Sequence, residues 1–168
     1  MKALDYLKFQ IKSMRSLQTS VLEDMNDEML AHKPLGTASS IGVIWLHMIA
    51  GEEEFLSIIS GEEALWETGG WNVKFRLEGA PNMGEDWLAY EDAEISCELL
   101  KSYTSSVSSR TQSYLDTLED GSLDETVKFF TEEDPKARVW ALLISHTLIH
   151  AGEIAAIKGV SGGRGLPF

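Results

Sequence analysis

The chain has 168 residues, of which 43% are hydrophobic and 24% charged, a composition typical of one globular domain over residues 1–168. Acidic residues outnumber basic ones 27 to 14, and the net charge of −13 opposes binding to nucleic acid or to an anionic membrane surface. This charge favours small molecules or proteins as partners, although it also serves simply to keep a protein soluble.

The cysteine content and the apolar runs bear on the compartment. Cys97 is the only cysteine, which excludes an intramolecular disulfide, and its place in a predicted helix favours a buried thiol. The N-terminal residues lack the apolar core of a secretory signal. The longest apolar runs, 41–50 and 139–144, are too short to span a bilayer. We therefore expect a cytoplasmic protein.

The first two helices are predicted from apolar residues that recur every three or four positions. In the first helix these residues are Leu4, Leu7, Ile11, Met14, Leu17, Val21 and Met25. A break at 33–36, which contains a proline and a glycine, separates this helix from a second one expected at about 41–60. Thr37, Ser39 and Ser40 are candidate N-caps for the second helix.

Residues 61–90 are rich in glycine and in large aromatic residues. A connection of this length is unusual in a compact domain and tends to be functional. Its aromatic side chains need burial, which they would find by folding back over one end of the bundle. We expect Trp71 and Trp87 to line a substrate pocket.

The third helix is expected at about 91–118, where its serine-rich stretch 102–109 must be held helical by packing. For the fourth helix, Asp134 is the expected N-cap, Pro135 the first helical residue and Gly159 the end.

The conformation of the linker around residues 127–130 is not predicted. Four long helices without a convincing strand predict an all-α fold, a four-helix bundle with a long crossover loop between its second and third helices.

Two histidines, His146 and His150, stand four residues apart in the fourth helix. This spacing places both imidazoles on one helix face, as two ligands of one divalent ion require. Thr147 occupies the position that the glutamate of a zincin HExxH motif would hold, so a zincin-type peptidase is disfavoured.

His47 is the candidate third ligand, because it lies in an otherwise apolar run where a buried imidazole needs a partner. The alternative for His47 is a hydrogen-bonded core histidine. Glu153 shares the face of His150 and has several possible roles. These roles are a further metal ligand, an acceptor for the N–H group of a ligand histidine, a general base acting on metal-bound water, and a carboxylate packed at the helix end.

The segments around these histidines resemble those of the DinB-like metalloprotein superfamily. They are 40–47 (SIGVIWLH), 143–154 (LISHTLIHAGEI) and the tail 165–168 (GLPF). The second is similar to the HxxxHxGE block that closes the family's fourth helix. Ala151 departs from the pattern, since relatives often carry a bulkier or basic residue there.

The resemblance implies a crossed-over four-helix bundle, frequently homodimeric. It also implies a zinc or nickel site in which His47, His146 and His150 leave open positions for water. Characterised relatives include thiol-dependent transferases and isomerases that use mycothiol, bacillithiol or glutathione, while many members have no established activity.

The leading hypothesis is therefore a metalloenzyme of the thiol-dependent transferase type that acts on small molecules. Against it, no basic residue is well placed in the sequence to bind the carboxylates of such a thiol. Two alternatives remain. One is a non-catalytic, stress-associated protein in which the ion joins two helices, and the other is a metal-dependent hydrolase with Glu153 as base. Imidazole ligands suit several divalent metals, so the residues alone do not choose the ion.

Overall fold

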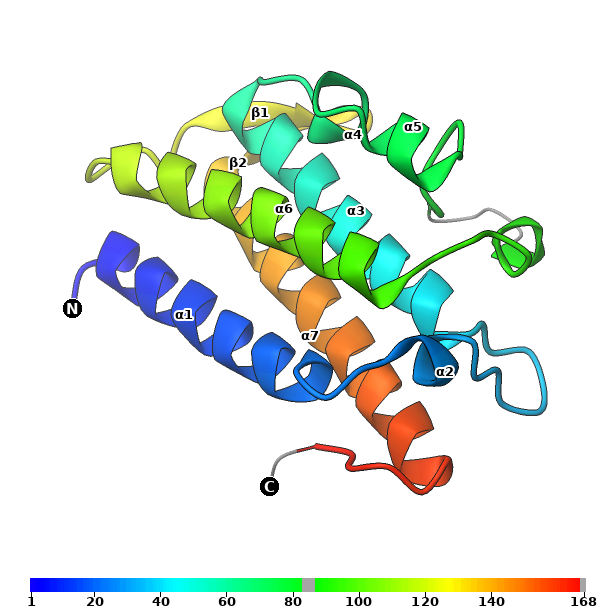
Figure 1. The fold of residues 1–168 in the computed structure, drawn as a ribbon. Coiled ribbons are helices and arrows are strands. Elements are labelled where there is room, and N and C mark those ends of the chain that lie inside the picture. Colours follow the sequence, from blue (N-terminus) through cyan, green and yellow to red (C-terminus); the bar gives the residue numbers. More distant parts are fainter. Residues whose placement is uncertain (83–86, 167–168) are drawn as a thin grey trace.

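The computed structural model describes residues 1–82 and 87–166 and shows a bundle of four long helices (Figure 1). The long helices are α1 Ala3–Leu22, α3 Ile41–Ser60, α6 Cys97–Thr117 and α7 Lys136–Val160. Shorter elements connect them: α2 Asp27–Leu30, α4 Leu65–Thr68, α5 Trp71–Phe75, the 3-10 helix η1 Trp87–Tyr90, and the strands β1 Thr126–Phe129 and β2 Glu132–Pro135. The predicted all-α bundle is confirmed. Residues 167–168 of the tail segment lie outside the described residues.

Helices α3 and α6 run in the same direction (Figure 1). The indole N–H of Trp45 donates to Thr104 Oγ1 at 2.9 Å near one end of the pair. Near the other end, the Tyr114 hydroxyl donates to the carbonyl oxygen of Ile59 at 3.1 Å. The two helices are therefore parallel, with the first turns of α6 beside the first turns of α3.

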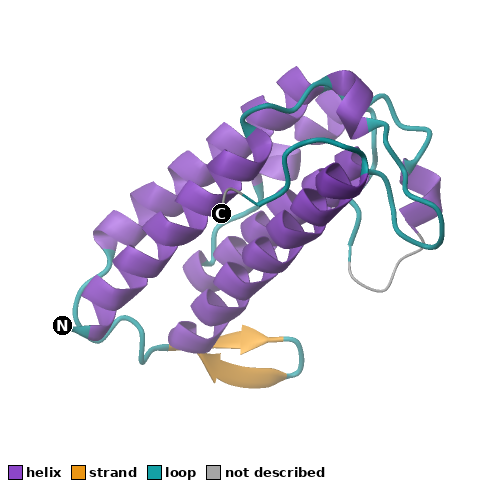
Figure 2. Ribbon diagram, turned by 90° about the horizontal axis from the view of Figure 1, so that it is seen from below, coloured by secondary structure: helices purple, strands orange, loops and turns teal. Residues whose placement is uncertain are grey.

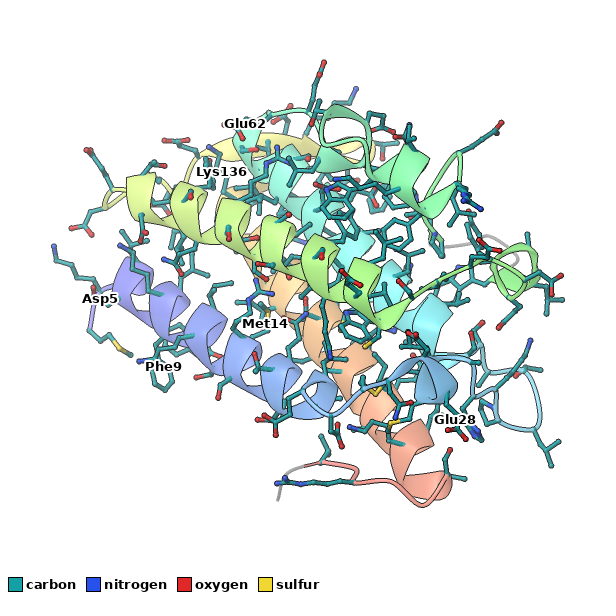
Figure 3. All side chains as sticks on the ribbon, viewed as in Figure 1. Asp5, Phe9, Met14, Glu28, Glu62 and Lys136 are labelled. Carbon is teal, nitrogen blue, oxygen red and sulfur yellow. The ribbon has the colours of Figure 1, made fainter. Side chains whose placement is uncertain are left out.

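Helix α3 is the central element, since every residue from 41 to 49 is buried. Helix α3 packs against α7 and α6, and α1 packs against α7; both α1 and α7 bury one face against the core and expose the other. Along α1, Met14 points into the bundle and is 1% exposed, whereas Phe9 points away from it and is 60% exposed (Figure 3). By length and composition, α7 is the one described helix apolar enough to cross a membrane, and in this fold it packs along α1 and α3.

The buried carboxylate of Glu52 joins three helices. It accepts hydrogen bonds from both terminal nitrogens of Arg15 on α1, at 2.8 and 2.5 Å, and one from the Thr111 hydroxyl on α6, at 2.7 Å. A buried carboxylate is tolerated only when it is paired and hydrogen-bonded in this way.

The next residue, Glu53, holds the start of the long connection in place. Its carboxylate accepts the backbone N–H groups of Leu65 and Trp66, the first two residues of α4, at 2.6 and 3.1 Å. It also accepts the Tyr103 hydroxyl of α6 at 2.6 Å. Glu53 thereby supplies α4 with the acceptor that its free N–H groups need.

The hairpin of β1 and β2 corrects the expectation that the chain has no strand. Phe129 pairs with Glu132 across a two-residue turn, and the hairpin lies at one end of the bundle (Figure 2). The expected cap of the fourth helix is also wrong, because Asp134 belongs to β2 and α7 begins at Lys136. A residue before proline is pushed towards extended geometry, which keeps Asp134 in the strand.

Other boundaries differ from the sequence expectations by a few residues. Helix α6 starts at Cys97, six residues later than expected, because the Ser96 hydroxyl caps it by accepting the N–H of Leu99 at 3.2 Å. The first helix ends at Leu22 and is followed by the short helix α2, which periodicity did not predict. A four-residue helix is too short to show a periodic pattern.

Substituting Arg15→Ala should lower the free energy of unfolding by about 3 kcal/mol, because Glu52 would stay buried without its cation. Urea unfolding at neutral pH measures the change. Arg76→Ala is the matched control: it breaks the exposed pair with Glu94, which is worth less than about 1 kcal/mol. Equal losses in the two variants would contradict the role assigned to Glu52.

Candidate metal centre

Three histidines meet where α3 and α7 pack side by side. His47 comes from α3, and His146 and His150 come from successive turns of α7. One ring nitrogen from each lies within 4.8 Å of the other two, and the Nε2 atoms of His47 and His146 are 3.0 Å apart. The structure therefore brings together the three residues that the sequence singles out.

Two of the rings are oriented by hydrogen bonds at Nδ1. His47 donates from Nδ1 to the carbonyl oxygen of Pro81 at 2.7 Å, and His150 donates from Nδ1 to the Glu153 carboxylate at 2.9 Å. Both acceptors require a proton on Nδ1, so each neutral ring keeps a free lone pair on Nε2. This arrangement is typical of histidines that bind a metal through Nε2.

The third ring, His146, has one polar atom that the described protein leaves unsatisfied. Its Nδ1 is buried without a hydrogen-bond partner, and its Nε2 faces the Nε2 of His47. An ion held at about 2.0–2.1 Å from each nitrogen, with bond angles of 90–110°, sets the nitrogens about 2.9–3.4 Å apart. The observed 3.0 Å between His47 and His146 falls in that range, so this pair is spaced as two ligands of one divalent ion are.

Burial favours the neutral form of the His146 and His47 imidazoles. It lowers the pKa of His146 to about 3, with the neighbouring His150 and His47 acting in the same direction. Burial also lowers the pKa of His47, against the opposing effect of the Pro81 carbonyl. Neutral imidazole is the form that binds metal. Near pH 7, protons therefore compete weakly with a metal ion for the ring nitrogens of His146 and His47.

Gly51 makes the close approach of the two helices possible, and sequence reasoning missed it. A Cβ atom at this position would lie 2.3 Å from Cε1 and 2.8 Å from Nε2 of His146. The imidazole thus occupies the space that any other residue would fill. The sequence does contain a signal for the role of Gly51. It follows His47 by four residues and therefore lies on the same helix face.

The histidines open onto a cavity of about 640 Å³. It lies between α3, α7, the hairpin and the end of the long connection. The described residues that line it are His47, Gly51, Glu54, Phe55, Ile58, Asn82, Trp87, Lys128, Phe129, Phe130, His146 and His150. The hairpin residues among them were not identified from sequence, since no local pattern shows that the hairpin folds against α3 and α7.

The two tryptophans expected to line a pocket lie in different places. Trp87 lines the cavity, with its ring centroid 4.2 Å from that of His47. Trp71 lies instead in the core, 5.0 Å from the ring of Tyr103 and beside Phe75, and it does not line the cavity. Glu153 contacts His150 and is not among the three clustered ligand groups.

The fold and the site define a helical bundle protein with three histidines at the edge of a cavity. The chain belongs to the DinB family, whose family model matches residues 3–157. No curated protein matches it.

Solved structures share the fold at low sequence identity. A conserved protein from Enterococcus faecalis is 21% identical with a TM-score of 0.76, and the match covers 96% of this chain and 99% of that one. A DinB-like protein from Bacillus subtilis is 18% identical with a TM-score of 0.66, covering 97% and 96%. One from Bacillus cereus is 16% identical with a TM-score of 0.63, covering 92% and 90%.

Substituting Gly51→Ala should push the His146 ring out of place and weaken zinc binding about 10- to 100-fold, as the loss of a ligand's supporting contacts does. Competition with a chromophoric chelator measures the affinity. The control is Gly152→Ala on α7, where an added Cβ meets nothing within 4 Å. Unchanged affinity in Gly51→Ala would show that the ring does not need this space.

Proposed function

We propose that the protein binds a divalent ion, zinc or nickel, through His47, His146 and His150 and catalyses thiol-dependent group transfer to small molecules. The observation that carries this proposal is the placement of three ring nitrogens within 4.8 Å of one another at the edge of an open cavity. An ion that only joined α3 to α7 would not need a cavity beside it, which favours catalysis over a purely structural role.

When bound, the ion would supply Lewis acidity, which favours the deprotonated form of a thiol near neutral pH. The protein's own residues prepare the site for it. The Pro81 carbonyl and the Glu153 carboxylate fix the rings of His47 and His150 through their N–H groups. Since Glu153 is engaged in this contact, we assign it a positioning role and favour transfer over hydrolysis with Glu153 as the base.

Charged residues on the cavity fit a thiol that carries ionic groups. Lys128 is the one lysine or arginine among the described lining residues, and it forms no ion pair within the described structure. Lys128 would bind the carboxylate of such a thiol. The sequence analysis did not identify a basic residue for this role. Glu54 also lines the cavity without a hydrogen-bond partner among the described residues, and burial raises the pKa of its carboxyl group.

Both side chains are exposed to solvent, and a thiol with a free ammonium and a carboxylate would offer each of them an ion-pair partner. A cytoplasmic, homodimeric protein belongs to the same proposal; the family resemblance supports the dimer, and the sequence features discussed above support the compartment.

Metal analysis of the purified protein tests the site. We expect about one equivalent of zinc or nickel in the wild type and less than a tenth of that in His47→Ala and in His150→Ala, because two imidazoles hold such an ion much more weakly than three. His32→Ala is the matched control, since His32 lies outside the cluster. A full equivalent in both ligand variants would sink the proposed site.

Turnover of a model electrophile tests the chemistry. The zinc- or nickel-loaded protein should accelerate the reaction of 1-chloro-2,4-dinitrobenzene with at least one of cysteine, glutathione, bacillithiol and mycothiol. Lys128→Ala should raise the KM for that thiol about tenfold with little change in kcat, since the lost ion pair acts on binding. Lys8→Ala, remote from the cavity, should behave as wild type. No rate above that of the free metal with any of the thiols would refute the transferase.

A further inference from the structure

A second cavity, of about 550 Å³, lies against the first. It is formed by the hairpin and by the face of α7 that carries Leu142, His146 and Ile149. Four residues line both cavities: Phe55, Phe129, Phe130 and His146. His146 is thus reached from both sides, from the cavity with all three histidines and from this one.

The second cavity is apolar where it meets the first. Phe55, Phe129 and Phe130 form the shared boundary, and Leu142 and Ile149 continue it along α7. Its charged lining residues are Arg138 and Asp134, which pair with each other, and Glu132, which is exposed and forms no ion pair among the described residues. A cavity of this kind recognises an alkyl or aryl group through burial of apolar surface.

Two large apolar side chains at this cavity are exposed to solvent. Phe130 is 69% exposed and Ile149 is 65% exposed. Phe130 also has a φ of +53°, which places a bulky residue in the left-handed region that glycine normally occupies. A positive φ is the usual geometry for the first residue of a two-residue hairpin turn, and the turn places Phe130 on the lining of both cavities.

A group-transfer enzyme needs sites for two substrates that meet at one reactive centre. The cavity with the histidines carries the unpaired charges of Glu54 and Lys128, which suit a zwitterionic thiol. The adjacent cavity has no unpaired cation among its described lining residues, is lined by Leu142 and Ile149 of α7, and reaches the same imidazole, His146. This division matches the chemistry of the two reactants: a polar, ionised nucleophile and an apolar electrophile.

We propose that the second cavity binds the alkyl or aryl group of an electrophilic second substrate, with Phe130 and Ile149 determining which groups are accepted. This assignment rests on the proposed thiol-dependent transfer. In that reaction the thiol sulfur forms a bond to the carbon that bears the apolar group. The bond from this carbon to the leaving group breaks with its electron pair, and the thiol proton departs with the leaving group.

Binding of a neutral apolar dye, N-phenyl-1-naphthylamine, to the metal-free protein tests the cavity without relying on activity. Its displacement by n-alkanols from butanol to octanol should strengthen up to about fourfold per added methylene, as burial of each CH₂ predicts. Ile149→Ser and Phe130→Asn should each weaken dye binding about tenfold. Both residues are exposed, and asparagine tolerates a positive φ, so neither change should unfold the protein.

Matched controls carry the same substitutions elsewhere. The controls are Val160→Ser, at the exposed end of α7, and Phe9→Asn, on the outer face of α1. Both variants should bind the dye as tightly as the wild type. Dye binding that is unchanged in Ile149→Ser and Phe130→Asn, or equally weakened in the controls, would overturn the assignment.

A paramagnetic ion links the cavity to the metal site. In protein loaded with Co²⁺, the protons of bound hexanol should relax faster than in zinc-loaded protein, and Ile149→Ser should abolish the difference. Hexanol that binds without this relaxation would place the cavity away from the centre and overturn the inference. Failure to take up Co²⁺ or zinc at all would instead count against the proposed function, while the dye result would still report on the cavity.

Discussion

The contact between the His146 ring and the bare backbone at Gly51 is the constraint on which the site depends. It lets α7 approach α3 closely enough for His47 to reach the two histidines of α7, with Nε2 atoms 3.0 Å apart. Close packing makes such an approach all-or-none, because one added methyl group has nowhere to go. The remaining ring orientations follow from partners on either side, Pro81 for His47 and Glu153 for His150.

A central helix as buried as α3 can carry three consecutive acidic residues only if each has its own environment. Successive residues of a helix point about 100° apart, so Glu52, Glu53 and Glu54 face different neighbours. Glu52 meets Arg15, and Glu53 meets the start of α4, so two of the charges are used to join elements. Glu54 is exposed to solvent at the cavity and has no protein partner among the described residues, so water can solvate its charge.

Local patterns predicted the four long helices and the histidine pair, because both depend on spacing within one helix. They also pointed to His47, since a lone imidazole in an apolar run needs a partner. They failed where the outcome depends on packing between distant segments. Trp71 and Trp87 look alike in a glycine-rich connection, yet Trp71 is taken up by the core beside Tyr103 and Trp87 lies on His47. The hairpin and Lys128 were missed for the same reason.

The histidines and part of the cavity lining come from different kinds of element, long helices on one side and a hairpin on the other. The three histidines stand on α3 and α7, whose geometry is set by the core and tolerates little adjustment. Phe129 and Phe130, by contrast, come from a two-stranded hairpin with a short turn and contribute to both cavities. Phe129 is buried and packs against Phe55, which in turn contacts the His146 ring, whereas Phe130 is exposed. Because Phe55 of α3 and His146 of α7 line both cavities as well, the hairpin and the two helices shape this space together.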